Sequence, residues 1–375
     1  MTTPISIDEW VNHYKSLLQM NGEQFDKLAE TETQFHNDTP LDFPFTCKEV
    51  KTCISSLKLN KKEGIDLILN EFIKYGSSIL LTTLVKLFNK ILKEGIFPES
   101  WHLSLLSSIY KSGDPVEPSN YRGISVCSCL GKLFSRHLQK RLDVFLESNN
   151  LLSPNQAGFR KGQRTTDNVY ILRSVINKYI CKPNGKVFTC SVDFKKAFDS
   201  VWRQALLYKI FRLGIGGNFY NIIKNMYSHT KYSCKNSNFY SEPFLANACV
   251  KQGDNLSPTL FNIFIDDIKD YFDEKLTDPV VLNNVSINHL LYADDLVFMS
   301  QSPEGLQHCV GALLKFCNEW KLDLNTRKTK TVFICRKNIV HETFCFHYGH
   351  SIIELVTEYK YLGILFKNTG ILFNR

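Results

Sequence analysis

The chain has 375 residues, of which 43% are hydrophobic and 13% aromatic, and its formal net charge is +8. This length predicts two or three packed subdomains, and the apolar content excludes disorder over most of the chain. The modest positive charge suits a nucleic-acid partner but also many other enzymes, so charge alone does not select a function class.

The twelve cysteines show neither a C-x-x-C pair nor a Cys/His cluster with zinc-ligand spacing. No secretory signal is visible in Met1–Tyr14. We therefore expect reduced, mostly buried thiols in an intracellular protein that is nuclear, cytoplasmic or both. The longest apolar stretch, Ile79–Phe88, is too short to span a bilayer, so no membrane segment is predicted.

Helix-start signals organise the first part of the chain. Ser6 and Glu9 have the spacing of a capping box, and Thr46 and Glu49 repeat it ahead of a helix over 50–57. The polar stretch 21–44 between these signals predicts a linker. The next predicted elements are a helix over 77–93 that ends at Gly95, a strand over 103–110, a turn over 111–115 and a helix over 130–146.

The second half mixes strands, hairpins and helices. A strand is predicted over 186–193, after a Pro-Asn-Gly turn, and an apolar strand, an acidic tip and a second apolar strand follow one another over 290–299. Paired strands are predicted over 231–234 and 244–250, and single strands over 331–335 and 361–366. Helices are predicted over 202–213, 219–227, 256–272 and from the N-cap Ser302 to Trp320. This mixture predicts an α+β fold.

Two acidic positions stand where a carboxylate is costly. Asp193 ends a predicted strand, and Asp294 and Asp295 form the tip between two apolar runs. Carboxylates gathered there would repel one another unless cations neutralised them, which is the setting of a magnesium site. By spacing alone, however, an Asp-Asp pair is more often a solvated turn and a strand-end Asp a helix cap, so both interpretations stay open at this stage.

The residues around these acids carry a resemblance to a known family. The sequence YADDL at Tyr292–Leu296 resembles the metal-binding hairpin of reverse transcriptases, and VDFKKAFDSV at 192–201 is similar to the first metal-binding segment of the non-LTR retrotransposon and group II intron enzymes. Further blocks at 109–126, 155–168, 251–268, 324–330 and 359–366 follow in the order typical of LINE-type enzymes. The resemblance covers about 50–366 and identifies a reverse transcriptase of non-LTR retrotransposons.

The resemblance implies a right-hand polymerase fold, with fingers and a palm whose antiparallel sheet is flanked by helices. The expected ranges are an N-terminal helical extension and linker over 1–45, fingers with the start of the palm over 46–185, the palm over 186–366 and a truncated start of the thumb over 367–375. The thumb is thus expected to be largely missing, as in a piece of a longer retroelement polyprotein or a truncated genomic copy.

The implied reaction is RNA-directed DNA polymerisation, in which dNTPs are added to a primer 3′-hydroxyl. Asp193, Asp294 and Asp295 would hold two Mg²⁺ ions, with Mn²⁺ as a possible substitute, and Lys328 would protonate the leaving pyrophosphate. The implied partners are an RNA template, a DNA primer and dNTPs, with no membrane partner, and no oligomeric state is predicted.

Substrate contacts follow from the same resemblance. Lys111 and Arg122 match fingers residues that grip the triphosphate, and Phe198 stands where the family has a steric gate against ribonucleotides. Without the motif, Phe198 would be taken as a core aromatic, and Lys111 and Lys328 are equally well explained as surface charges. The remaining residues are Phe194, Gln252 and Gly253 for substrate binding, Arg160, Lys161 and Arg164 for the template backbone, and Asp199 as a structural hydrogen-bonding acid.

Two departures from the family pattern are visible. The segment KKEGIDLI lacks a Pro and a second Gly that relatives carry near 63–68, and Cys249 stands where many relatives have Gly. Two alternatives to an active enzyme of the LINE branch remain. One is a truncated, inactive nucleic-acid-binding remnant, and the other is a group II intron maturase-like or telomerase-like reverse transcriptase.

Overall fold

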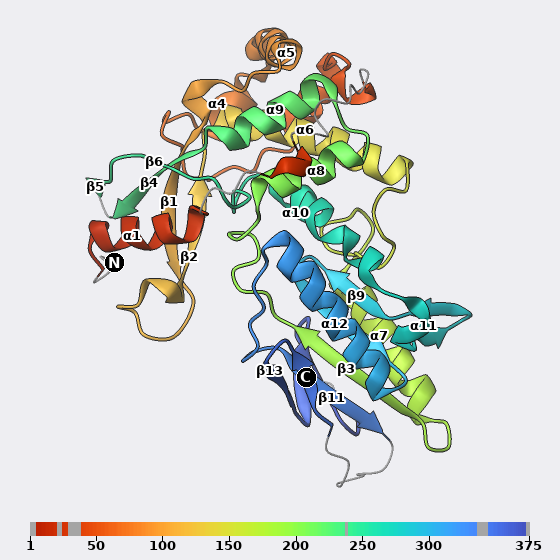
Figure 1. Ribbon diagram of the computed structural model, residues 1–375. Coiled ribbons are helices and arrows are strands. Elements are labelled where there is room, and N and C mark those ends of the chain that lie inside the picture. The colour runs from red at the N-terminus through yellow and green to blue at the C-terminus, as the bar shows by residue number, and fades with distance from the viewer. Residues whose placement is uncertain (1–4, 21–24, 29–38, 237–238, 336–343, 373–375) are drawn as a thin grey trace. The chain divides into compact units, whose positions relative to one another are not determined.

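The computed structural model describes residues 5–20, 25–28, 39–236, 239–335 and 344–372 (Figure 1). Contacts within the chain divide it into two compact units, each made from two separate stretches. The first unit comprises 1–151 and 198–264, and the second comprises 152–197 and 265–375. Of the helices in these described ranges, none combines the length and the apolar composition needed to cross a bilayer.

The first unit contains a small mixed sheet with one helix packed on it. Strand β1 (Leu103–Tyr110) pairs antiparallel with β2 (Tyr121–Val126) and parallel with β4 (Lys231–Asn236). The short strands β5 (Phe239–Tyr240) and β6 (Phe244–Leu245) each pair antiparallel with β4. Helix α1 (Ile7–Leu18) buries Trp10, Tyr14 and Leu18 in a cluster with residues of these strands.

Outside this sheet the first unit has further helices, two of which share an aromatic cluster. They are α3 (Cys47–Ser55), α4 (Asn70–Tyr75), α5 (Ser77–Glu94), α6 (Cys129–Ser148), α8 (Arg203–Arg212), α9 (Gly217–Ser228) and most of α10 (Ser257–Asp266), with 3₁₀ turns at Pro40–Asp42, Glu99–Trp101 and Pro118–Asn120. Phe88 of α5 and Phe134 of α6 are fully buried, with ring centroids 5.3 Å apart. Helix α5 ends at Gly95, whose φ of 68° is the left-handed conformation of a helix C-cap.

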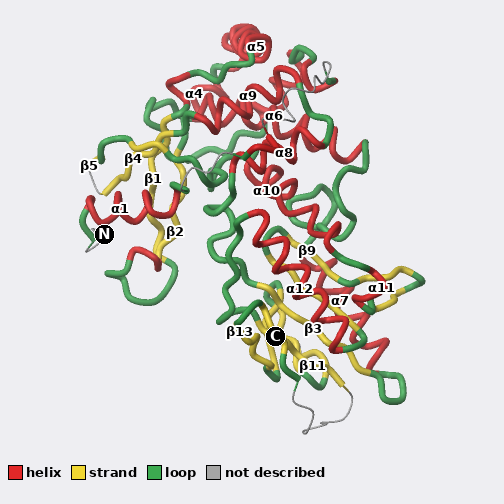
Figure 2. Tube along the Cα trace, viewed as in Figure 1, coloured by secondary structure: helices red, strands yellow, loops and turns green. Residues whose placement is uncertain are grey.

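The second unit is built on a six-stranded sheet (Figure 2). Its strand order is β12 (Phe346–Tyr348), β13 (Ser351–Leu355), β11 (Lys330–Cys335), β3 (Lys186–Val192), β10 (Asp295–Ser300) and β9 (His289–Tyr292). In the series β11, β3, β10 and β9, each strand is antiparallel to the next one, whereas β13 pairs parallel with β11. The central strands β3, β10 and β11 are almost entirely buried, and most of their residues are apolar.

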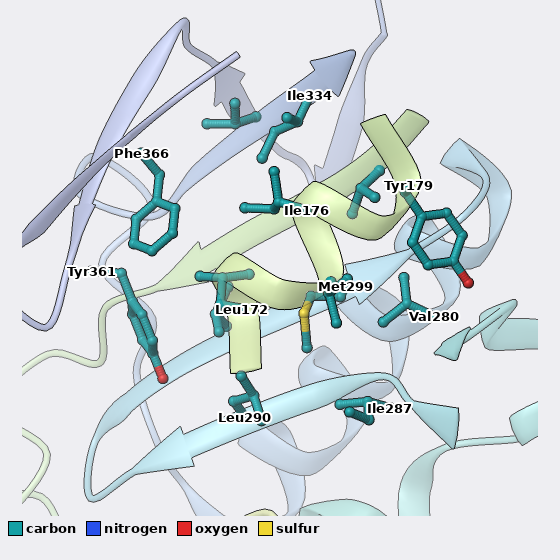
Figure 3. Packing of buried hydrophobic residues seen from close by; sticks show 14 of the residues in the cluster. Leu172, Ile176, Tyr179, Val280, Ile287, Leu290, Met299, Ile334, Tyr361 and Phe366 are labelled. Atoms are coloured by element: carbon teal, nitrogen blue, oxygen red, sulfur yellow. The ribbon is translucent and has the colours of Figure 1, made fainter. Parts of the chain in front are cut away.

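Two helices cover the two faces of this sheet. Helix α7 (Thr165–Ile180) places Leu172, Ile176 and Tyr179 against alternate strand residues such as Met299 and Leu290, as Figure 3 shows. Helix α12 (Pro303–Trp320) contacts β3 and β10 and buries its own apolar side on the sheet. The remaining elements are η4 (Asp267–Tyr271), α11 (Glu274–Thr277), the hairpin of β7 (Val280–Leu282) and β8 (Val285–Ile287), and a small sheet of β14 (Glu358–Tyr361), β15 (Ile364–Lys367) and β16 (Gly370–Leu372).

Local signals in the sequence predicted several elements well. Both capping boxes are confirmed, because Ser6 and Thr46 each exchange hydrogen bonds with the Glu three residues later. The strand over 103–110 and the helix with Ser302 as its N-cap also agree with the structure. The α+β class is confirmed. Much of the predicted linker over 21–44 lies outside the described residues.

Three predicted elements were wrong in extent. The strand over 361–366 is a hairpin, because Leu362 and Gly363 both have positive φ and turn the chain between β14 and β15. The strand over 244–250 stops at Leu245, and the helix over 256–272 changes to a 3₁₀ turn after Asp266. Helix α7 was not predicted, although its buried residues Leu172, Val175, Ile176 and Tyr179 have helical spacing.

The subdomain ranges expected from the sequence stay predictions. The two structural units are defined by contacts within the chain, whereas the ranges 1–45, 46–185, 186–366 and 367–375 were defined by resemblance to functional subdomains.

Candidate active site

Asp294 lies in a two-residue turn between the buried strands β9 and β10. Tyr292 pairs with Asp295 across the hairpin, so the turn consists of Ala293 and Asp294 alone. Ala293 has a φ of 58°, which closes such a tight turn but is uncommon for a residue other than glycine. The apolar residues on both sides fix the register of the hairpin, because a shift by one residue would turn them toward solvent.

Asp193 follows the last residue of β3, directly beside this hairpin. Leu296 of β10 pairs with Val192 of β3 in antiparallel register, so Asp295 and Asp193 occupy the next facing positions. Residues about one hundred positions apart in the sequence are thus neighbours in the second unit. This is the juxtaposition that the sequence predicted for Asp193, Asp294 and Asp295.

The turn before β11 holds the main chain of Asp193. Its N–H donates to the hydroxyl of the fully buried Thr329 (3.1 Å), and its carbonyl accepts from the N–H of Asn325 (2.8 Å). The same turn carries Lys328, whose side chain is exposed and whose N–H donates to the Asn325 carbonyl (3.1 Å). Asn325 and Thr329 were not singled out from the sequence, although they flank Lys328 in a block that was.

The carboxylates interact electrostatically. Asp295 keeps contact with solvent, yet partial burial, followed by the negative charges of Asp294 and Asp193, raises the pKa of its carboxyl to about 6. A bound divalent cation would reverse this effect, because it favours the ionised form of all three groups. The oxygen donors therefore have the chemistry that a hard cation such as magnesium requires.

These side chains do not form a complete metal cage by themselves. Over the described ranges, no group of three or more His, Cys, Asp or Glu residues is arranged to hold a metal ion. Magnesium in nucleotide-transferring sites is usually held by one or two carboxylates together with substrate phosphates and water. The hairpin and the end of β3 thus fit the protein-derived part of such a site.

Residues predicted to bind substrate come together in the first unit. The β1–β2 register pairs Ile109 with Arg122, and the N–H of Lys111 donates to the Asn120 carbonyl (3.0 Å), so Lys111 and Arg122 lie on one face of the hairpin. Both side chains are exposed. A pocket of about 220 Å³ opens along this face of the sheet, lined by Lys62, Glu63, Gly64, Ile65, Leu67, Leu105, Ser107, Val126, Lys235 and Tyr240.

Gln252 and Gly253 pack against β2 of the same sheet. The Gln252 carbonyl accepts from the Ser125 N–H (2.7 Å), and a side chain at Gly253 would lie 3.0 Å from the Ser125 carbonyl oxygen. The φ of 109° at Gly253 also favours glycine. The Gln252 amide donates to the carboxylate of Asp199 (2.9 Å), the kind of structural hydrogen bond expected for this acid.

Phe198 and Phe194 lie in different units of the chain. Phe198 is half-buried in the first unit, where its ring stacks on Phe261 with centroids 4.4 Å apart. Phe194 is 6% exposed in the second unit, and its main chain bridges to Leu324. The assignment of both residues to substrate binding stays a prediction.

The residues predicted to follow the template also differ from one another. The Arg160 guanidinium donates to the carbonyls of Ser153 (2.6 Å) and Gln156 (3.1 Å), and so it stabilises its own loop. Lys161 and Arg164 are exposed in the same stretch. The positive charge available to a polyanion is therefore greater at these two residues than at Arg160.

A buried arginine supports the segment that leads to Gln252, and the sequence did not reveal it. Arg203 is 5% exposed and donates to the carbonyls of Cys249 (2.9 Å), Tyr227 (2.7 Å) and Ala246. Cys249 has a φ of 75°. A charged residue among the apolar positions of helix α8 was the available signal.

Comparison with known proteins places this site in a family. The family described as "Reverse transcriptase (RNA-dependent DNA polymerase)" matches residues 109–366. A probable RNA-directed DNA polymerase from transposon BS of Drosophila melanogaster is 29% identical over 91% of this chain and 38% of its own length. The RNA-directed DNA polymerase from mobile element jockey of Drosophila funebris is 29% identical over 90% of this chain and 37% of its own length.

A third relative comes from a retrotransposable element. The Pol polyprotein from the type-2 retrotransposable element R2DM of Drosophila melanogaster is 31% identical over 76% of this chain and 27% of its own length. The chain therefore spans less than two fifths of the length of these three relatives.

A solved structure of similar fold is apo telomerase from Candida tropicalis, truncated from its C-terminal domain. It matches with a TM-score of 0.50 and 14% identity, over 83% of this chain and 62% of that chain. At this identity the likeness concerns the fold alone, and it confirms the right-hand polymerase class expected from the sequence.

Proposed function

Because the chain belongs to the reverse transcriptase (RNA-dependent DNA polymerase) family, we propose that it copies an RNA template by adding dNTPs to a DNA primer 3′-hydroxyl. The observation that carries the proposal is the register of β3 with β10, which makes Asp193 and Asp295 neighbours beside the Asp294 turn. Two Mg²⁺ ions, or Mn²⁺ in their place, would when bound stabilise the attacking and leaving oxygens of the displacement.

The protein residues divide the remaining work among them. Asp193, Asp294 and Asp295 would hold the ions, and the charges of Lys111 and Arg122 would bind the triphosphate. The Phe198 ring would exclude a 2′-hydroxyl, while Gln252 and Gly253 would contact the nucleotide. Lys328, exposed on the turn that anchors Asp193, would donate a proton to the leaving pyrophosphate.

The nucleic-acid partners are part of the same proposal. Lys161 and Arg164 would contact the template through its phosphates, which requires no reading of sequence. The names of the relatives, RNA-directed DNA polymerases, support an RNA template, and the DNA primer is part of the proposal. A nuclear or cytoplasmic location stays a prediction.

Primer extension with Asp294→Asn tests the proposal. The purified chain is given a DNA primer annealed to an RNA template, dNTPs and Mg²⁺, and the extended primer is measured. Asp294→Asn should lower the incorporation rate at least about 100-fold, because carboxylate–metal contacts supply several kcal/mol of transition-state stabilisation.

Asp278→Asn is the matched control in the same unit. Asp278 has a φ of 44°, a conformation that Asn tolerates, and its contacts with Gln301 and Ser300 use its main-chain carbonyl. This variant should extend the primer at the unmodified rate. Equal rates for Asp294→Asn and the unmodified chain would contradict the proposal.

A further inference from the structure

The segment 153–158 runs alongside the catalytic hairpin of the second unit. The Leu291 N–H donates to the Asn155 carbonyl, and the Ala157 N–H donates to the Leu291 carbonyl. The N···O distance is 2.9 Å in both hydrogen bonds. Gln156 thereby forms a parallel bridge with Leu291, two residues before the turn at Ala293 and Asp294. Main-chain contacts thus place the Gln156 side chain at the turn.

The Gln156 side-chain amide contacts both the N–H and the carbonyl of the turn residue Ala293. Its side chain is 0% exposed, and its Oε1 accepts from the N–H groups of Ala293 (3.0 Å) and Gly158 (2.8 Å). Its Nε2 lies 3.4 Å from the Ala293 carbonyl. Two N–H donors converge on one side-chain atom, so that atom must be the oxygen.

The turn needs such support for two reasons. A left-handed conformation at a residue with a Cβ costs about 1–2 kcal/mol, and Ala293 holds it while 3% exposed. The next two residues are Asp294 and Asp295, whose charges repel each other. A neutral amide can satisfy the Ala293 peptide without adding a charge, whereas a Glu or Lys at the same position would change the charge at the site.

Gly158 allows the segment to approach this closely. A Cβ at residue 158 would lie 2.1 Å from the Ala293 nitrogen and 2.9 Å from its Cα, so any side chain would push the segment away. Gln156 and Gly158 therefore act on the same peptide, one through hydrogen bonds and the other through the space that it leaves free.

We propose that Gln156 is a positioning residue, which fixes the Ala293–Asp294 turn so that the Asp294 and Asp295 carboxylates are set for catalysis. The inference rests on the proposed function, because it concerns the same carboxylates. A merely structural amide would stabilise the fold equally but would not affect the chemical step selectively.

The test compares Gln156→Met with a matched variant, Asn168→Leu. Met keeps the length of the side chain and removes its hydrogen bonds. Asn168 is also a buried amide (3% exposed), and it donates to the Leu291 carbonyl (2.9 Å) of the same strand without touching the turn. For each variant, hydrogen exchange of the 289–296 amides, melting temperature, kcat and the KM for dNTP are measured on the full chain.

Gln156→Met should release the protection of the Ala293 amide, and it should lower kcat about 10- to 100-fold with KM within about twofold. Asn168→Leu should lower the melting temperature at least as much while leaving kcat within about threefold. Gly158→Ala should reproduce the effect of Gln156→Met, because it displaces the same contact from the other side.

Three outcomes would overturn the inference. The first is an equal loss of kcat in Gln156→Met and Asn168→Leu, and the second is unchanged protection of the Ala293 amide in Gln156→Met. If Gln156→Met does not fold, the third is fast exchange of the Ala293 amide in the unmodified chain. Exchange needs no turnover, so an inactive unmodified chain would contradict the proposed function while leaving the role of Gln156 separately measurable.

Discussion

The pKa of Asp295 depends on the residues around its side chain. Its carboxyl has a raised pKa because burial and the negative charges of Asp294 and Asp193 oppose its ionisation. Carboxylates that repel one another in this way are typical of a functional site, where a bound cation neutralises them. The stability gained elsewhere in the β3–β10–β9 core is what keeps the three acids together.

The steric gate can be tested at Phe198. Phe198→Val removes the ring that stacks on Phe261, so the sugar subsite gains space and ribonucleotide incorporation relative to dNTP should rise at least about tenfold. Competition between the two nucleotides on one primed template measures the ratio.

Phe88→Val is the control for this substitution. It removes a fully buried ring of the same unit far along the chain, so it should lower stability and leave sugar selectivity unchanged. An unchanged ratio in Phe198→Val would assign Phe198 to the core.

Sequence patterns identified the acidic residues and the reason why they should meet. Apolar runs around Asp294 and a strand before Asp193 predicted a hairpin and a strand end, and the family resemblance paired them. Gln156 could not be found in this way, because its role depends on which strand the 153–158 segment lies against. That register is a tertiary property, and no local periodicity encodes it.

Among the elements, the loop after β6 was predicted to continue as a strand. A strand cannot continue through 246–250, because Cys249 adopts a left-handed conformation. In addition, the buried Arg203 guanidinium donates hydrogen bonds to the carbonyls of Ala246 and Cys249, which a neighbouring strand would otherwise bind. An apolar sequence predicted the strand, and an arginine more than forty residues earlier prevented it. Capping boxes, in contrast, were predicted correctly because each depends on residues only three positions apart.

The conformation of this loop predicts that Cys249→Gly is tolerated. Relief of the left-handed strain, worth about 1–2 kcal/mol, should offset most of what is lost with the thiol, namely its burial and its contacts with the Arg203 guanidinium and the Tyr232 hydroxyl. The loss in the free energy of unfolding should therefore be small. Urea denaturation gives the comparison.

Cys234→Gly provides the contrast for that measurement. Cys234 is also buried but lies in strand β4, where no backbone strain is relieved by glycine. The free energy of unfolding of this variant should therefore fall by about 2 kcal/mol or more. A loss in Cys249→Gly as large as that in Cys234→Gly would show that strain at residue 249 is unimportant.

At the scale of the whole molecule, buried histidines should make stability depend on pH. Burial lowers the pKa of His137, His289 and His102 to about 4 each, whereas an unfolded histidine titrates near 6.5. The unfolded chain therefore binds more protons below pH 6.5, so the stability present at pH 7 falls as the pH decreases from about 6.5 toward 4.

The contribution of His137 can be separated by substitution. Each such histidine contributes a slope of up to about 1.4 kcal/mol per pH unit, so His137→Leu should reduce the fall in unfolding free energy between pH 6.5 and 5. Urea denaturation at both pH values measures it. His308, exposed on α12, is the control, and His308→Gln should keep the full slope. Equal slopes in both variants would mean that His137 can be protonated within the fold.

The interleaving of the two units limits how such an enzyme can be recombined. The chain passes from one unit to the other after Leu151, Ala197 and Phe264, and the second passage falls between Asp193 and Phe198. A single crossover between related genes cannot exchange one unit intact, so a chimaera that takes one whole unit from a relative needs a crossover at all three junctions. The crossover after Ala197 would divide the motif over 192–201, so the two parents would have to be compatible within that motif.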